Sequence, residues 1–262
     1  MKTIHLLLYP LLQVCFLLLG CYFMYRNIYL TLLFGFLSAL FLNFSLHISI
    51  HFHVHFKLKN KYLNSLTDFL ASILIGIPFH YYQLSHWNHH RHNNSIEDFT
   101  STWTSVNGTI IPKSFLRILL FWPFAGSIRI SEQIKIGKKE GYFTTKNHSR
   151  LKFELILNLI FISTLFIINI YVGYYYLCIF YVGWSMIAIH NYGQHLPEKY
   201  GVLLANSYYD NLYNNLFYNN GLHYEHHQKP ELKYWELKSE NKGKISHPHL
   251  LEGFYFLFKP KK

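Results

Sequence analysis

The longest stretch of this chain without a formally charged side chain runs for 43 residues, from Leu155 to Pro197. A helix crosses the hydrocarbon core of a bilayer in about 20 residues, so this stretch allows two crossings with a tight turn between them, which we expect near Gly173. Two further uncharged runs lie close to the N-terminus, separated by a short turn at residues 25–27. We therefore predict four transmembrane helices in two hairpins, at about residues 4–23, 28–49, 153–172 and 174–193.

The placement of the basic residues predicts which ends of these helices face the cytoplasm. Of the 24 Lys and Arg residues, 13 fall in residues 57–152 and 9 in residues 193–262, whereas only Arg26 falls in a predicted outer loop. Cytoplasmic loops carry such an excess, so we expect both termini and a cap of about residues 50–152 and 194–262 on that side. The net charge of +11 is therefore concentrated in the segments that flank the apolar runs. We expect no nucleic-acid partner, because no basic run carries a recognition motif.

The remaining apolar stretches are too short to cross. Residues 69–82 contain Gly76 and Pro78, so we expect this stretch to lie at the membrane interface or dip into it. Residues 114–129 are expected to form another interfacial helix, and residues 131–152 an exposed basic loop. The predicted fold is an all-α integral membrane protein with interfacial helices and a cytoplasmic histidine-rich cap, in a single domain over residues 1–262.

Histidines recur at helical spacing in this predicted cap. The pattern HxxHH occurs twice, a pair spaced i, i+4 comes earlier, and one more histidine follows four residues after Asn191. Residues at i, i+3 and i+4 lie within about 100° of one another around a helix, so their rings can meet at one place. Nine imidazoles are enough to hold two metal ions. The predicted ligands are His51, His55, His86, His89, His90, His195, His223, His226 and His227.

Some neighbouring residues leave alternatives open. His47 shares the helical face of His51 and His55 and could replace one of them as a ligand after a shift of one turn. His53 points to the opposite side of such a helix, and we expect no ligand role for it. Asn191 could meet a metal ion through a water molecule, or it could orient a neighbouring ligand. His190 is expected to be packed or hydrogen-bonded within the last span.

Ligating histidines usually need an acceptor for their second ring nitrogen. The candidate acceptors are Asp98, Asp210 and Glu225. The other histidines have no cluster partner, and we expect them to be ordinary surface or interfacial residues. These are His5, His80, His92, His148, His247 and His249.

The residue types restrict the metal chemistry. Neutral imidazole suits iron, zinc, copper or nickel, and carboxylate-bridged di-iron bundles would show Glu-x-x-His instead. A structural zinc site needs only four ligands and often uses cysteine. The three cysteines lack CxxC spacing, and no HExxH motif of a zinc protease occurs. An all-histidine centre with two ions is therefore favoured.

The order of these motifs resembles that of the membrane fatty acid desaturase and hydroxylase superfamily. His51-x3-His55, His86-x2-His89-His90 and His223-x2-His226-His227 match its three histidine boxes, and Asn191 with His195 matches its NxxxH element. The likeness covers about residues 47–235 and is greatest to short bacterial-type acyl-lipid desaturases. A histidine rather than a glutamine at position 223 departs from the front-end desaturases, whose fused cytochrome domain is also absent.

This resemblance implies an oxidoreductase that holds two iron ions and uses O2 to remove two hydrogens from a lipid acyl chain, forming a C=C bond. No electron-carrier motif is present in the sequence, so electrons would come from a separate ferredoxin or a cytochrome b5 type donor with its reductase. A lipid or carotenoid hydroxylase or ketolase of the same superfamily remains an alternative. A histidine-rich metal transporter is the alternative from a different class, although such proteins often carry histidines in loose loops.

Overall fold

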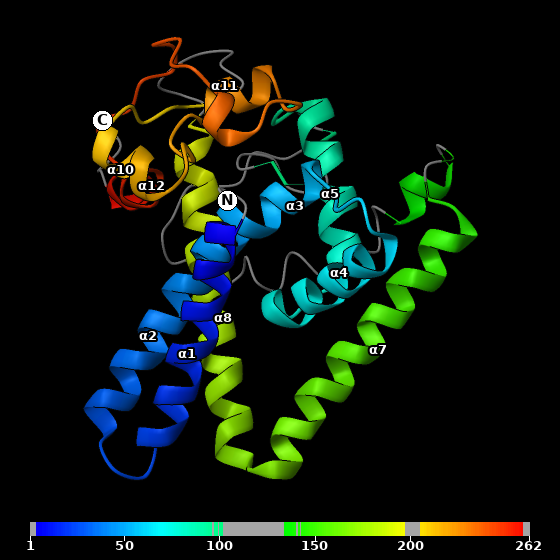
Figure 1. The fold of residues 1–262 in the computed structure, drawn as a ribbon, viewed down its shortest axis with the longest axis vertical. Helices are drawn as coiled ribbons and strands as arrows, with labels where there is room; N and C mark the ends of the chain where they lie inside the picture. The colour runs from blue at the N-terminus through cyan, green and yellow to red at the C-terminus, as the bar shows by residue number, and fades with distance from the viewer. Residues whose placement is uncertain are drawn as a thin grey trace. The chain divides into compact units, whose positions relative to one another are not determined.

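The computed structural model describes residues 4–95, 97–98, 100–101, 134–139, 141, 143–196 and 205–258. Over these residues the named elements are all helices (Figure 1), and extended pairing is limited there to one bridge between Ser207 and Lys244. The all-α prediction is confirmed for this part of the chain.

The chain divides into two compact units. The first contains Met1–His53, Lys57–Leu84 and Ile130–Trp184, and the second contains Val54–Phe56, Ser85–Arg129 and Ser185–Lys262. The single domain over residues 1–262 stays a prediction.

The first helical hairpin of the first unit lies where the first two spans were predicted, but its first helix has only 16 residues and is not among the helices long enough to cross a membrane. A short 3-10 helix, η1 (Ile4–Leu7), leads into α1 (Leu8–Phe23), and α2 (Ile28–Phe44) returns beside it (Figure 1). Asn27 begins α2 because its side-chain oxygen accepts from the Leu30 N–H at 3.1 Å, which satisfies one of the open donors of the first turn.

Beyond α2 the chain stays helical. A π-helix, η2 (Ser45–Ile50), connects α2 to the short helix α3 (His51–His55). Together they form a continuous helical stretch of 28 residues, Ile28–His55, which is long and apolar enough to cross a membrane.

The second hairpin consists of α7 (Thr145–Ile168) and α8 (Ile170–Gln194) (Figure 1). The chain turns at Asn169 and not near Gly173, so the predicted turn was wrong by four residues. Asn169 has extended backbone, and its Oδ1 accepts from the Tyr171 N–H at 2.9 Å, which caps α8. This asparagine was the sequence signal for the turn.

The segment predicted as an exposed loop, residues 131–152, is partly helical. Residues 134–139 form a helical turn, and α7 already begins at Thr145, where the Thr144 side chain accepts from the Asn147 N–H at 3.3 Å. The predicted interfacial helix at 114–129 lies outside the described residues.

Between these hairpins, α4 (Lys61–Ile75) and α5 (Phe79–His92) form a helix pair bent by 89°. The bend falls at Gly76, whose φ of 65° is left-handed, and a Cβ there would lie 2.4 Å from the Phe180 ring. The described residues hold three helices able to cross a membrane by length and composition, or four if the bent pair is one span. The chain is thus a multi-pass membrane protein by these criteria.

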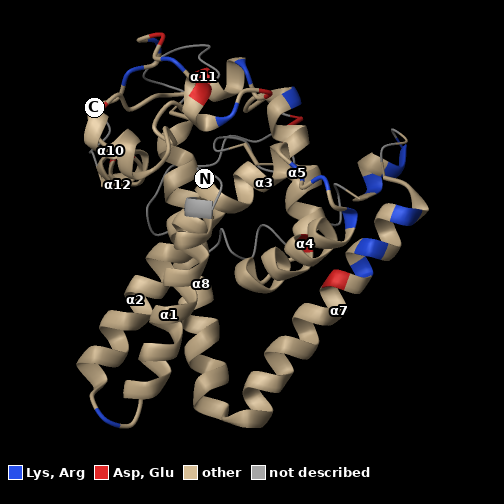
Figure 2. Cartoon of the chain, in the orientation of Figure 1, with Lys and Arg blue, Asp and Glu red and all other residues tan. Residues whose placement is uncertain are grey.

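Charged side chains lie at the ends of the long apolar helices of the first unit. On α7 the charged side chains gather at the N-terminal end, from Lys146 to Glu154, and the rest of the helix carries none (Figure 2). In the α1–α2 hairpin the basic side chain, Arg26, lies at the connecting turn (Figure 2). Thus α1, α2 and the part of α7 that follows Glu154 carry no charged side chain.

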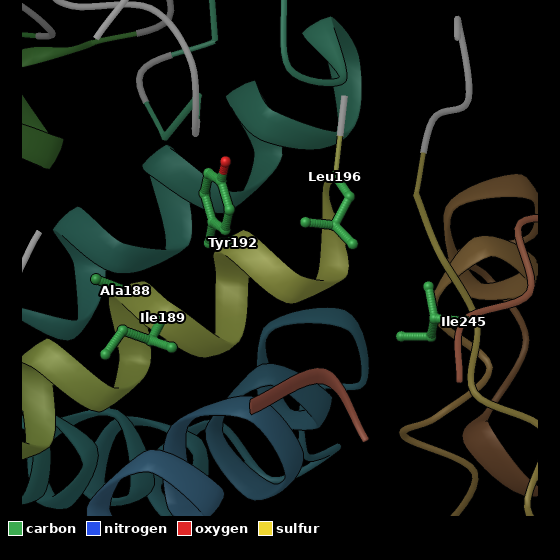
Figure 3. Close-up of a cluster of buried hydrophobic side chains, with 5 residues drawn as sticks. All are labelled: Ala188, Ile189, Tyr192, Leu196 and Ile245. Atoms are coloured by element: carbon green, nitrogen blue, oxygen red, sulfur yellow. The ribbon is translucent and has the colours of Figure 1, made fainter. Parts of the chain in front are cut away.

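The core of the second unit lies at the C-terminal end of α8. Figure 3 shows four side chains of this end and Ile245, which comes from the segment just before the C-terminal helix. The C-terminal helix α12 (His249–Phe258) packs against this cluster. The buried members are Ala188, Ile189, Tyr192, Leu196 and Ile245.

Close backbone contact fixes α12 on α8. A Cβ at Gly193 would lie 1.9 Å from the His249 carbonyl oxygen, and one at Gly253 would lie 2.1 Å from the Ile189 carbonyl oxygen. Three short helices also belong to the described part of this unit: α10 (Asn211–Leu216), α11 (His223–Gln228) and η3 (Tyr234–Glu236).

Candidate metal centre

Two helices carry the HxxHH motifs. His86, His89 and His90 lie on α5, and the second motif forms all but the last residue of α11. The start of α11 is fixed locally because the Asn214 side chain donates to the Tyr208 carbonyl at 2.8 Å and accepts from the Gly221 N–H at 3.0 Å. A side chain at Gly221 would collide with the same carbonyl, at 2.4 Å. The turn that leads into α11 therefore requires this glycine.

Eight of the nine predicted ligands form two groups within the second unit. In each group the candidate ligand atoms lie within 4.8 Å of one another. The first group is His55, His86, His90 and His226, and the second is His89, His195, His223 and His227. The ninth, His51, lies one turn before His55 on α3, with its ligand atom within 4.8 Å of that of His55.

Each HxxHH motif is divided between the groups. On α5, His86 and His90 belong to the first group and His89 to the second. Positions i+3 and i+4 lie on either side of position i, about 100° apart around the helix, so one helix can serve two centres. On α11 the two groups are exchanged: His223 and His227 belong to the second group and His226 to the first.

The distances between ring nitrogens fit bound metal ions. Imidazole nitrogens bind ions such as zinc at about 2.1 Å, so two ligands at right angles on one ion stand about 3.0 Å apart. The four Nε2–Nε2 distances are 2.8 Å for His55–His86, 3.2 Å for His90–His226, 3.0 Å for His89–His195 and 3.1 Å for His195–His223.

Asp98 orients one of these rings. The Nδ1 of His89 lies 2.6 Å from its Oδ2, and the carboxylate also accepts from the N–H groups of Asn94 and Thr100. Burial alone would raise the pKa of Asp98, but the contact with His89 and these N–H donors outweigh it and lower the pKa. An ionised carboxylate only accepts, so His89 carries its hydrogen on Nδ1 and turns the Nε2 lone pair toward its group. Of the three candidate acceptors, Asp98 is thus confirmed as the partner of a predicted ligand.

Asn93 does the same for His227, and the sequence reasoning missed it. Its Oδ1 lies 2.7 Å from the His227 Nδ1. The Nε2 of His227 is buried and has no hydrogen-bond partner in the described part of the chain, as expected for a nitrogen that awaits a metal ion. Asn93 and Asn94 have left-handed φ values of 43° and 70°. Paired asparagines directly after a helix were the available signal, because asparagine tolerates this conformation at helix ends.

The His51 ring contacts a backbone carbonyl of the preceding π-helix. The Nδ1 of His51 lies 3.2 Å from the His47 carbonyl oxygen, so its Nε2 is left as the acceptor nitrogen. The His47 ring in turn contacts the Asn43 carbonyl oxygen at 3.0 Å. His47, the rival to His51, belongs to neither group.

Burial keeps the rings in the neutral form that binds metal. Burial, and after it the neighbouring histidines, lowers the pKa of both His223 and His227 well below the ordinary value. A neutral imidazole keeps one lone pair for a ligand bond, whereas an imidazolium has none.

The other candidate acceptors have structural partners. Asp210 caps α10 by accepting from the Tyr213 N–H at 2.7 Å. Glu225 is buried and accepts from the Ser207 hydroxyl at 2.6 Å and the Tyr209 hydroxyl at 2.7 Å, so it ties α11 to the preceding loop.

Asn191 contacts a backbone carbonyl of the same unit. Its side-chain amide donates to the Thr100 carbonyl at 3.4 Å, and its predicted role toward a metal ion stays a prediction.

The remaining histidines divide between confirmed and wrong predictions. His53 is not in either group and pairs with Asp68, and its lack of a ligand role stays a prediction. His190 stacks on His249 with ring centroids 5.7 Å apart, as expected for a packed residue. His249 is not a surface residue: it is fully buried, and its Nε2 lies 2.9 Å from the Asn206 carbonyl oxygen. His80 is also buried, because it lies just after the bend between α4 and α5.

The donor set suits two metal ions rather than one. Within the described residues both groups consist of imidazole alone, without a thiolate or a carboxylate. Eight or nine ligands exceed what one four-coordinate zinc ion uses, and imidazole suits iron.

No curated protein and no solved structure matches the chain. The model of the family described as Fatty acid desaturase matches residues 27–242. The matched stretch begins at the cap of α2 and contains all nine predicted ligands together with Asn93 and Asp98. Most of the chain is covered, and by this match the protein belongs to the fatty acid desaturase family.

Proposed function

We propose that this protein is an O2-dependent di-iron desaturase that introduces a C=C bond into the acyl chain of a lipid. The observation that carries the proposal is the pair of buried all-imidazole groups in a member of the fatty acid desaturase family. Two iron ions, one at each group, would supply the O2 chemistry needed to remove hydrogen from unactivated carbon.

The proposed ligands are assigned by group. The first ion would be held by the four histidines of the first group together with His51, and the second ion by the four histidines of the second group. Asn191 is proposed to meet an ion through a water molecule or to orient a neighbour. The full set is His51, His55, His86, His89, His90, His195, His223, His226 and His227.

The chain's own part in the reaction is to hold these rings and keep water away. Asp98 and Asn93 fix the rings of His89 and His227, so the second group does not have to reorganise when it binds a cation. His223 and His226 are among the buried residues, so bulk water is excluded from their nitrogens.

The proposal includes partners and a location. The substrate would be a lipid acyl chain, which reaches the protein through the membrane. Electrons would come from an external ferredoxin or a cytochrome b5 type protein with its reductase. We further propose that the histidine groups and both termini face the cytoplasm, as the distribution of basic residues suggests.

Lipid profiling of a heterologous host tests the function. Total fatty acids from cells that express the wild type or His226→Ala are compared by gas chromatography with mass detection. We expect a new unsaturated fatty acid in the wild type and none in the variant. The control is His92→Ala, because His92 lies on α5 next to the first motif but belongs to neither group.

The same experiment separates the alternatives. A hydroxylated acyl chain, or an oxygenated carotenoid in a carotenoid-producing host, would indicate the hydroxylase or ketolase reaction. Iron bound to the purified protein with no lipid product in any of several hosts would contradict the desaturase proposal.

A further inference from the structure

A cluster of charged residues built around buried carboxylates in the first unit lies outside both histidine groups. Its centre is Asp68 on α4, which is 1% exposed. The Oδ1 of Asp68 lies 2.6 Å from the His53 Nε2 and 2.7 Å from the Lys57 Nζ, and the other carboxylate oxygen contacts the Arg150 guanidinium. A carboxylate with three such partners has exchanged its hydration for fixed protein donors.

His53 connects this cluster to the predicted ligand helix. It lies on α3 between His51 and His55, two residues from each. Two residues correspond to about 200° of rotation, so His53 faces away from the side that carries both predicted ligands. The Asp68 carboxylate only accepts, and His53 therefore donates its Nε2 hydrogen to it. The His53 ring also packs against Phe79, with centroids 5.4 Å apart.

The carboxylate of Asp68 is itself held firmly. Arg150 on α7 bridges it to Glu154, and Glu154 accepts from the Ser72 hydroxyl at 3.2 Å and from the His80 N–H at 2.8 Å. These contacts connect α4, α7 and the first turn of α5. The position of Asp68 is thus fixed, and a hydrogen bond to it can hold a short neighbouring helix in one orientation.

The short helix α3 needs an outside contact to fix its orientation. It has only five residues and follows six residues of π-helix, whose wider turns change the rotation of everything after them. A helix this short has little stability of its own, and metal ligands must be placed within about 0.5 Å.

We propose that Asp68 is a positioning residue. By holding His53 it fixes the rotation of α3 about its axis, and this rotation directs His51 and His55 toward the ion that the first histidine group would bind. The inference rests on the proposed function, because it assigns an ion to that group. It adds a residue from outside the histidine motifs to the machinery of the centre.

The test compares two replacements of His53. In His53→Gln the side-chain amide can donate to Asp68 from nearly the same place as the Nε2 of histidine, whereas His53→Leu keeps the packing on Phe79 but cannot donate. Iron per chain is measured on each purified full-length protein by mass spectrometry of the metal. Cobalt(II) titration of metal-stripped protein gives the affinity of each ion separately.

We expect the wild type and His53→Gln to hold two ions. His53→Leu should retain one of them, with a 10- to 100-fold weaker affinity for the other, the usual effect of losing a residue that orients a ligand. Tyr175→Phe is the matched control, because it removes a different hydrogen bond of the same unit, from the Tyr175 hydroxyl to the Thr31 carbonyl. It should keep both ions.

Each other outcome has a clear meaning. Two tightly bound ions in His53→Leu would overturn the inference, and so would an equal loss in Tyr175→Phe. A wild type that binds no iron or cobalt would instead refute the proposed function. Should His53→Leu not fold, Arg150→Gln loosens the carboxylate from the other side, and unchanged affinity for both ions in that variant would also overturn the inference.

Discussion

The His227 ring on α11 donates its Nδ1 hydrogen to the side-chain oxygen of Asn93, 2.7 Å away at the end of α5. The contact joins the segments that carry the two HxxHH motifs, and it leaves the Nε2 of His227 for a metal ion.

Replacement of Asn93 tests this contact. Asn93→Ala should weaken metal binding by about 10- to 100-fold, because the His227 ring loses the acceptor that orients it. Asn93→Asp keeps an acceptor, and aspartate also tolerates the left-handed φ of 43°. The rate of iron loss to a chelator is measured for both variants. Equal rates would show that the ring does not depend on this acceptor.

Asp98 provides a second test with a neighbouring control. Asp98→Leu removes the acceptor of His89 and leaves the N–H groups of Asn94 and Thr100 without their partner, so we expect loss of the second ion. Glu97→Gln changes an exposed carboxylate one residue away and should bind metal like the wild type. Cobalt(II) titration of both proteins decides. If Asp98→Leu keeps wild-type affinity, the carboxylate does not support the centre.

His195 should act on one group only. Its Nε2 lies close to those of His89 and His223, so His195→Ala should lower the bound iron from two ions to one. Metal analysis of the purified variant checks this expectation. Loss of both ions at once would mean that the two groups bind metal as a unit.

Tyr209 should affect stability more than metal binding. Tyr209→Phe removes a donor from the buried Glu225 carboxylate, which should cost about 1–3 kcal/mol of stability. Thermal unfolding of the metal-free protein in detergent measures the difference. Tyr29→Phe, at a tyrosine that is 80% exposed on α2, should leave the midpoint unchanged. A large shift in the control would assign the effect to tyrosine loss in general.

Much of the site could be predicted because helical spacing is local. His86 and His90, or His223 and His227, share a helix face whatever surrounds them, and all eight predicted ligands of the second unit do lie in the two groups. The division of each motif between groups could not be predicted, because it depends on how separate segments meet.

The features that the sequence did not predict also depend on how separate segments meet or on local backbone geometry. A turn was predicted at Gly173 because glycine is the commoner turn residue, but Asn169 makes the turn because its extended backbone ends α7 and its side chain caps α8. The burial of His249 depends on the contact of Gly193 and Gly253 across two helices. Neither the π-helix before α3 nor the His53–Asp68 pair leaves a regular pattern in the sequence.

The acceptors that hold the Nδ1 hydrogens of His51, His89 and His227 all belong to the polypeptide. Which nitrogen of each ring faces inward is therefore settled during folding, without help from a cation. Folding of the chain and binding of the metal ions can therefore take place at different times. A cell short of iron would be expected to accumulate finished but inactive chains, which could be activated later without making new protein.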